Sequence, residues 1–140
     1  MLDRNRTLWC SWAVLAPSRR LYFGGDSGYH PDFARVGARY GPFDLALLPI
    51  GAYEPRWFMQ PVHMNPEEAV RACRDARAAV LIPMHWGTFQ LTDEAMDEPP
   101  QRTRAAWQAA GLPPEDLWLL APGETRWLDT RDGGRGKGEG

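Results

Sequence analysis

Cysteine is scarce in this chain, and neither a long apolar run nor a strong net charge is present. The two cysteines, Cys10 and Cys73, fit neither a disulfide framework nor a zinc knuckle, so we expect free buried thiols in a reducing compartment. No run approaches the ~20 apolar residues of a membrane helix, and residues 1–6 lack the core of a signal peptide. We therefore expect a cytoplasmic location. The net charge of −2 gives no indication of a nucleic-acid partner.

The length of 140 residues predicts one domain that is large enough for a real core. We expect this domain to span residues 1–128, followed by a Gly-rich, charged and disordered tail at 129–140. Seven tryptophans are many for this length. Because Trp is large and amphipathic, it suits pocket walls and interfaces as well as cores.

Three short apolar runs each stop at Gly or Pro, a pattern typical of buried strands in an α/β fold. Residues 21–23 lead through two glycines to Asp26, residues 44–49 lead to Pro and Gly, and residues 80–84 lead to His85. Ligands in open α/β sheets gather beyond the carboxyl ends of the strands. The three strand ends are therefore predicted to meet at one site.

A helix is predicted from Asn65, which can cap it together with Glu68 in a capping box, to about Ala78. It connects two strands in a right-handed crossover. Its buried stripe is expected to contain Ala69, Cys73, Ala76 and Val80. The other expected elements are a hairpin of strands 8–15 and 20–24, a helix at 31–40, a helical turn at 92–95 that Pro99 and Pro100 interrupt, a helix at 101–110, and short strands at 117–120 and 125–128.

Asp26 and His85 are the candidate metal ligands. A carboxylate after two glycines is either a turn residue that bonds its own backbone or a hard oxygen ligand that can bridge two cations. A histidine at a strand end is either a structural hydrogen-bonding residue or a zinc ligand whose tautomer is set by a neighbouring group. The residues alone leave both alternatives open.

His63 lies on a long aromatic loop, residues 51–63, which is typical of a functional segment or lid. It either shapes the entry to the next helix or acts as a proton shuttle or donor to a charged oxygen. His30 is expected to be exposed, and Asp44 is expected to be a turn or cap residue.

The number of candidate donors falls short of a complete metal site. Catalytic zinc usually keeps three protein ligands, and structural zinc takes four. The chain has three histidines and no His-x-His cluster. Asp26 and His85 alone are expected to hold a metal weakly.

Several long motifs in the sequence have a recognisable order. They are residues 25–29, 41–53, 54–59, 63–70 and 85–89. Together they resemble the metallo-β-lactamase superfamily, and in particular the branch of N-acylphosphatidylethanolamine-hydrolysing phospholipase D. The resemblance covers about residues 5–128.

The resemblance implies an αββα sandwich with two zinc ions per complete site. It implies that Asp26 is the bridging aspartate, His85 a late metal-ligating histidine, and His63 a catalytic residue in substrate handling or proton transfer. A metal-activated hydroxide is expected to attack a phosphodiester, giving an N-acylethanolamine and phosphatidic acid.

The family's His-x-His-x-Asp-His cluster and middle metal histidine are not found in this sequence. The chain therefore resembles the C-terminal half of the sandwich: one sheet flanked by helices, with an apolar sheet face left open. We expect it to be inactive by itself, as the product of a truncated gene or as one partner of a split protein.

Other functions remain open at this point. The same fold serves lactonases and nucleases, and the chain could instead be a non-catalytic module that pairs with a separate N-terminal half or forms a homo-oligomer. The aromatic residues Trp57, Phe58 and Met59 favour an N-acyl phospholipid or other lipid-like phosphodiester. Peripheral membrane contact is a further expectation.

Overall fold

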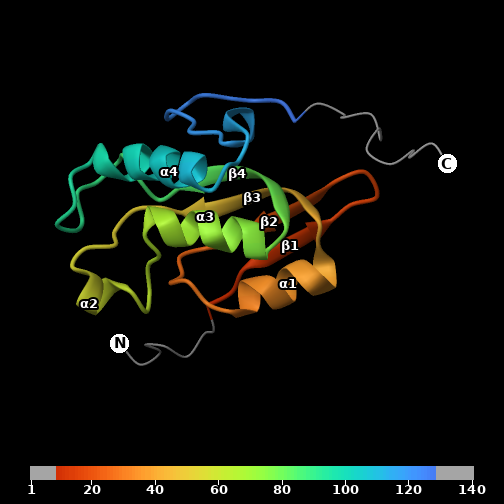
Figure 1. Ribbon diagram of the computed structural model, residues 1–140, viewed down its shortest axis with the longest axis horizontal. Helices are drawn as coiled ribbons and strands as arrows, with labels where there is room; N and C mark the ends of the chain where they lie inside the picture. The colour runs from red at the N-terminus through yellow and green to blue at the C-terminus, as the bar shows by residue number, and fades with distance from the viewer. Residues whose placement is uncertain (1–8, 129–140) are drawn as a thin grey trace.

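The computed structural model describes residues 9–128, which form a four-stranded sheet with helices packed on it (Figure 1). The strands lie in sequence order across the sheet. The first pair is antiparallel, and the next two pairs are parallel. The strands are β1 (Trp12–Leu15), β2 (Arg20–Phe23), β3 (Phe43–Pro49) and β4 (Ala78–Met84).

The helices connect these strands or follow them. They are α1 (Asp32–Tyr40), α2 (Arg56–Met59), α3 (Pro66–Asp75), α4 (Glu98–Ala109) and the 3-10 helix η1 (Pro114–Asp116). The predicted capping box starts α3: the Asn65 side chain accepts from the Glu68 N–H, and the Glu68 side chain accepts from the Asn65 N–H. Within the described residues, no helix has both the length and the apolar character needed to cross a bilayer.

The core lies between α1, α3 and α4 and one face of the sheet (Figure 1). The cross-strand register places Tyr22, Ala46 and Leu81 side by side on this face. All three are buried, as are Ala69 and Cys73 on the facing side of α3. Alternation along the strands thus directs every second residue to the helices.

The opposite sheet face is open at β1 and β2, as expected. Trp12 pairs with Phe23 and Val14 with Leu21, so these side chains share that face. Trp12 is 64% exposed, Val14 52% and Phe23 41%. Three large apolar side chains on adjacent strands form a contiguous patch of a kind that most soluble proteins avoid.

Some expected elements are wrong. Pro99 and Pro100 do not interrupt a helix but lie in the first turn of α4, where their missing N–H groups need no partner. Helix α3 ends at Asp75, so Val80 belongs to β4 and not to the helical stripe.

The strands expected at 117–120 and 125–128 are also absent from the described residues. Leu117 forms one parallel bridge to Leu81, and the Trp118 N–H donates to the Leu81 carbonyl (2.9 Å). The Leu120 N–H then donates back to the Trp118 carbonyl (3.1 Å), which ends the pairing. Cys73 is a buried free thiol as expected, but Cys10 is exposed. The tail at 129–140 lies outside the described residues.

Candidate metal centre

The candidate site lies at the carboxyl edge of the sheet, where three strands end together. The chain leaves β2 toward Asp26, β3 toward Gly51 and β4 toward His85. This edge is on the left of Figure 1, together with α2 and the loop that precedes α4. The parallel direction of β2, β3 and β4 brings residues far apart in sequence to one rim.

Asp26 and His85 are neighbours at this rim. The Nε2 atom of His85 lies 3.5 Å from Oδ2 of Asp26. The aspartate side chain is 60% exposed, and the imidazole is 25% exposed. His85 has a left-handed backbone (φ 61°), a conformation that is uncommon for a residue with a side chain and that clusters at functional sites. The structure thus brings the two predicted ligands together.

The spacing of these donors suits a shared cation. Two ligands at ~2.1 Å from a tetrahedral zinc ion lie roughly 3.4 Å apart, close to the observed separation. One neutral imidazole and one carboxylate form a typical donor set for zinc. Within residues 9–128, however, no group of three or more His, Cys, Asp or Glu side chains could hold a metal ion. The pair therefore fits the chemistry of a zinc site but not its full donor number.

His63 completes the cluster of side chains at the rim. Its ring stacks on His85, with centroids 5.0 Å apart. The Met64 N–H donates to the Ser27 carbonyl (3.0 Å), which ties the His63 segment to the Asp26 turn. Within the described residues, His63 Nδ1 and Ser27 Oγ are buried without a hydrogen-bond partner. Buried polar atoms of this kind are typical of a site that binds another group.

Burial lowers the pKa of His63, and the neighbouring His85 lowers it further, although the charges of Asp26 and Glu94 oppose this. An imidazole with a lowered pKa is neutral at pH 7. His63 can therefore accept a proton at this rim.

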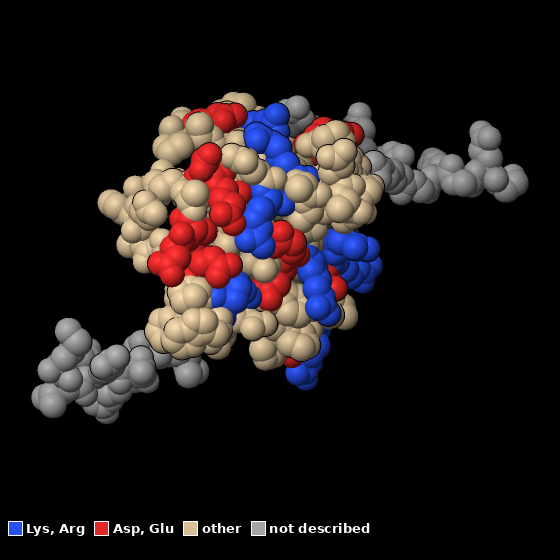
Figure 2. Space-filling model, turned by 60° about the vertical axis from the view of Figure 1, so that its left-hand side comes forward, with Lys and Arg blue, Asp and Glu red and all other residues tan. Residues whose placement is uncertain are grey.

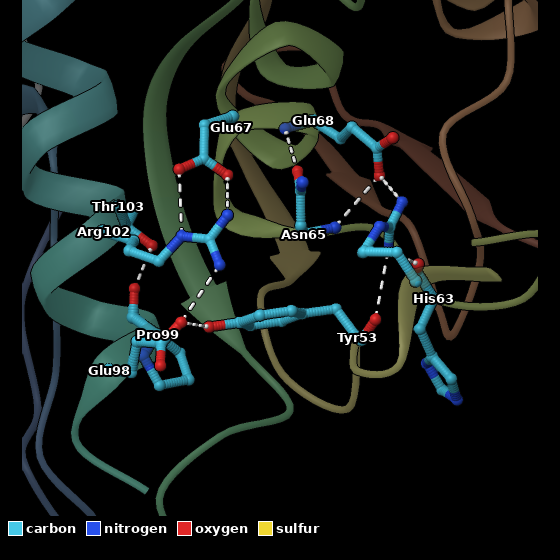
Figure 3. A network of polar contacts seen from close by, with 10 residues as sticks. Tyr53, His63, Asn65, Glu67, Glu68, Glu98, Pro99, Arg102 and Thr103 are labelled. Carbon is cyan, nitrogen blue, oxygen red and sulfur yellow. Dashed lines mark hydrogen bonds and ion pairs between the residues drawn. The ribbon is translucent and has the colours of Figure 1, made fainter. Parts of the chain in front are cut away.

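Arg56 holds the segment that carries His63. Its guanidinium donates to the His63 carbonyl (3.0 Å) and to Glu68 Oε2 (2.8 Å), the oxygen that also accepts the Asn65 N–H. Figure 3 shows Asn65 and Glu68 at the start of α3, with the His63 ring pointing away from the network. The capping box of α3 thus also anchors the aromatic loop.

A second network braces the other side of the loop. The Tyr53 hydroxyl donates to Glu98 (2.8 Å), and Arg102 donates to both Glu98 (3.0 Å) and Glu67 (2.7 Å) (Figure 3). Burial, together with the hydrogen bond to Glu98, raises the pKa of Tyr53, so it remains protonated as a donor. In the view of Figure 2 acidic and basic side chains adjoin one another across the middle of the molecule.

Glu94 is a buried residue of the rim that the sequence pattern did not single out. Its carboxylate accepts from the Ala52 N–H (2.7 Å), the Glu54 N–H (3.1 Å) and the Thr92 hydroxyl (2.7 Å). Ala52, like His85, has a left-handed backbone (φ 61°). Glu94 thus holds the loop after β3 in an uncommon conformation. No local pattern marks such a residue, because the two backbone N–H groups that it accepts lie about forty positions earlier.

Replacing Glu94 by Gln is expected to reduce the free energy of unfolding by about 2 kcal/mol at pH 7, because a buried charged acceptor is lost. Burial alone raises the pKa of Glu94, but hydrogen bonds from Thr92 and backbone N–H groups outweigh burial and hold the pKa below the ordinary value of a glutamate. A carboxylate whose pKa is lower in the folded protein than in the unfolded chain stabilises the fold at every pH above its unfolded-state pKa. This stability is lost as the pH falls through its folded-state pKa. The difference between the two proteins should therefore shrink below about pH 4.5.

Urea unfolding at pH 7 and pH 4 measures this difference. Asp93→Asn is the matched control, because Asp93 is exposed beside Glu94 and should change stability by less than about 0.5 kcal/mol. An equal loss in both variants, or a loss that does not depend on pH, contradicts the role of the Glu94 carboxylate.

An apolar groove adjoins His85. It has a volume of about 290 Å³, and its lining residues include Ala52, Trp86, Phe89 and Leu91. Phe89 is 75% exposed and Leu91 69% exposed. An apolar groove beside polar groups is the usual form of a small-molecule site.

The exposed aromatic side chains of the loop at residues 51–63 do not line this groove. Trp57 is 84% exposed and Phe58 64%, and their rings contact each other. Neither lines the groove beside His85. His30 is exposed as expected. Asp44 accepts the Arg20 N–H (2.7 Å), so it links β3 to β2 and takes no part in the site.

The chain is similar to several known proteins. Residues 1–86 match the family described as the beta-lactamase superfamily domain. An uncharacterized protein of Mycobacterium tuberculosis is 54% identical over 124 residues, which are 86% of this chain and 32% of that protein. The N-acyl-phosphatidylethanolamine-hydrolyzing phospholipase D 1 of Caenorhabditis elegans is 47% identical over 109 residues, which are 76% of this chain and 31% of that protein.

A solved structure shares the fold. The match to the metallo hydrolase Igni18 of Ignicoccus hospitalis covers 80% of this chain and 42% of the Igni18 chain, with a TM-score of 0.59 and 27% sequence identity. The chain spans about a third of the length of the M. tuberculosis and C. elegans relatives.

Proposed function

The chain belongs to the beta-lactamase superfamily, and from that premise we propose that it acts in metal-dependent hydrolysis of a phosphodiester, with an N-acyl phospholipid as the preferred substrate class. The observation that carries the proposal is the pair of Asp26 and His85, 3.5 Å apart at the carboxyl edge of the sheet. The apolar groove beside His85 and the likeness to the C. elegans phospholipase D support the substrate class.

Each residue of the rim has a distinct role in this proposal. Asp26 and His85 would hold a zinc ion, which when bound supplies a Lewis acid that neutralises charge developing on a phosphate oxygen. His63, kept neutral by burial, accepts or returns a proton beside the reacting phosphate. Phe89 and Leu91 receive an apolar part of the substrate. Since two donors hold zinc weakly, we expect this chain to be inactive without added zinc and to turn over slowly only when zinc is in excess.

Hydrolysis of N-acylphosphatidylethanolamine in mixed micelles with excess zinc tests the proposal. We expect slow release of phosphatidic acid that increases with zinc and falls at least about tenfold in both Asp26→Asn and His85→Ala. Phe89→Ser should weaken binding of this substrate while leaving hydrolysis of the small diester bis(4-nitrophenyl) phosphate unchanged. Asp93→Asn serves as the folded control.

A lactone and single-stranded DNA are assayed in parallel because lactonases and nucleases are the alternative functions. Single-stranded DNA is itself a phosphodiester, so its faster turnover would reject the N-acyl phospholipid but retain phosphodiester hydrolysis. Faster turnover of the lactone would reject phosphodiester hydrolysis as well. Either result would retain the metal site. Turnover that persists in both ligand variants would reject the site itself.

A further inference from the structure

A second cavity, unrelated to the metal centre, lies between the end of α4 and the segment that follows it. Its volume is about 520 Å³, which is within the range of small-molecule sites. Arg104, Trp107 and Gln108 contribute from one face of α4, at the helical spacing of three and four residues. None of its lining residues borders the rim or the groove beside His85.

Part of the wall of this cavity is apolar and held in place. Leu112, Leu117, Leu119 and Leu120 line it, and all four are only half-buried. The Trp107 indole N–H donates to the Pro113 carbonyl (2.8 Å), which fixes the ring that forms part of the wall. The bond from the Trp118 N–H to Leu81 anchors the opposite wall to β4. A segment without strands of its own is thus fixed over the helix.

The charged groups lining the cavity do not balance. Arg104 and Arg126 line it together with a single acid, Glu124. Among the described residues Arg104 has no ion pair or hydrogen bond, whereas Arg102, two positions earlier, is paired to Glu67 and Glu98. Arg126 lies over the Trp118 ring at 5.1 Å, which leaves its N–H groups available. The Glu124 carboxylate accepts the Ala121 N–H (3.0 Å).

We propose that this cavity binds an aliphatic carboxylate, a fatty acid of medium chain length, with its tail against the leucines and its head group on Arg104 and Arg126. Two guanidinium groups and one carboxylate leave a single excess positive charge, which matches a monoanion. Guanidinium recognises a carboxylate with two parallel hydrogen bonds. The proposal does not depend on the function assigned to the metal centre.

Titration of the ¹⁵N-labelled full chain with decanoate, observed by NMR, tests the proposal. Decanol, which lacks the charge, and acetate, which lacks the tail, are titrated in parallel. We expect saturable shifts of amides in residues 104–126 with decanoate, about tenfold weaker binding of decanol, and no saturation with acetate. This result would show that both the carboxylate and the aliphatic tail of decanoate contribute to its binding.

Variants separate the head group from the tail. Arg104→Gln should weaken decanoate binding about tenfold without changing decanol binding, and Leu119→Asn should weaken both. Arg74→Gln is the matched control, because Arg74 is an exposed arginine on α3 outside the cavity. Equal affinities for decanoate and decanol, an Arg104→Gln variant that binds decanoate normally, or shifts centred on Trp12 and Phe23 of the open sheet face would each overturn the proposal.

Discussion

Replacing Gly51 by alanine is expected to reduce the free energy of unfolding by about 3 kcal/mol or more and to disorganise the rim. A Cβ atom at this position would collide with the His85 carbonyl oxygen, so the backbone would have to move. The hydrogen bond from the Ile50 N–H to the Met84 carbonyl (3.0 Å) holds the two strand ends together and opposes that movement. The strain therefore falls on His85.

Urea unfolding monitored by circular dichroism measures the effect, and Gly87→Ala provides the comparison. Gly87 lies on the same rim with φ 75° but has open space around it, so alanine there should cost only about 1 kcal/mol of backbone strain. If the two variants lose the same stability, the close contact with His85 is not the reason for glycine at position 51.

Zinc is expected to bind this chain weakly and to depend on both Asp26 and His85. A structural site with four ligands contributes about 10–16 kcal/mol, so two donors supply about half, corresponding to a Kd between about 1 and 200 µM. Removing either side chain leaves one donor, which on the same scale supplies about 2.5–4 kcal/mol, so the Kd should rise to about 1 mM or more. Isothermal titration calorimetry of wild type, Asp26→Ala and His85→Ala measures this loss.

His30→Ala is the control for zinc binding at an exposed histidine and should leave the affinity unchanged. Stoichiometric binding tighter than micromolar would show that donors beyond this pair complete the site. An equal loss in His30→Ala and His85→Ala would place the zinc elsewhere on the chain.

Local sequence patterns were sufficient for much of the fold. The apolar runs of β3 and β4, the hairpin of β1 and β2, and the start of α3 at Asn65 all follow from neighbouring residues. Local sequence patterns gave the wrong element where the local preference for a strand competes with the availability of a pairing partner elsewhere in the chain. Apolar residues at 117–120 read as a strand, but only Leu117 forms a bridge to β4. After the Trp118 N–H donates to Leu81, the Leu120 N–H bonds back to the Trp118 carbonyl and the pairing ends.

The candidate site was predictable in part for the same reason. Asp26 and His85 each follow an apolar strand, so their position beyond strand ends is a local property of the sequence. Glu94 and Arg56 contact the rim from loops and a short helix, and their partners are distant or irregular in sequence. No periodicity could reveal them. The cavity at Arg104 was equally hidden, because a helix and an irregular segment form it together.

The sequence by itself determined the α/β class, the strand ends that carry Asp26 and His85, and the capping of α3, since each depends on residues within a few positions of one another. Only the tertiary structure decided that the two side chains lie 3.5 Å apart, that His63 stacks on His85, and which arginines remain unpaired. These properties depend on parallel strand pairing and on the packing of loops, which bring together residues separated by tens of positions.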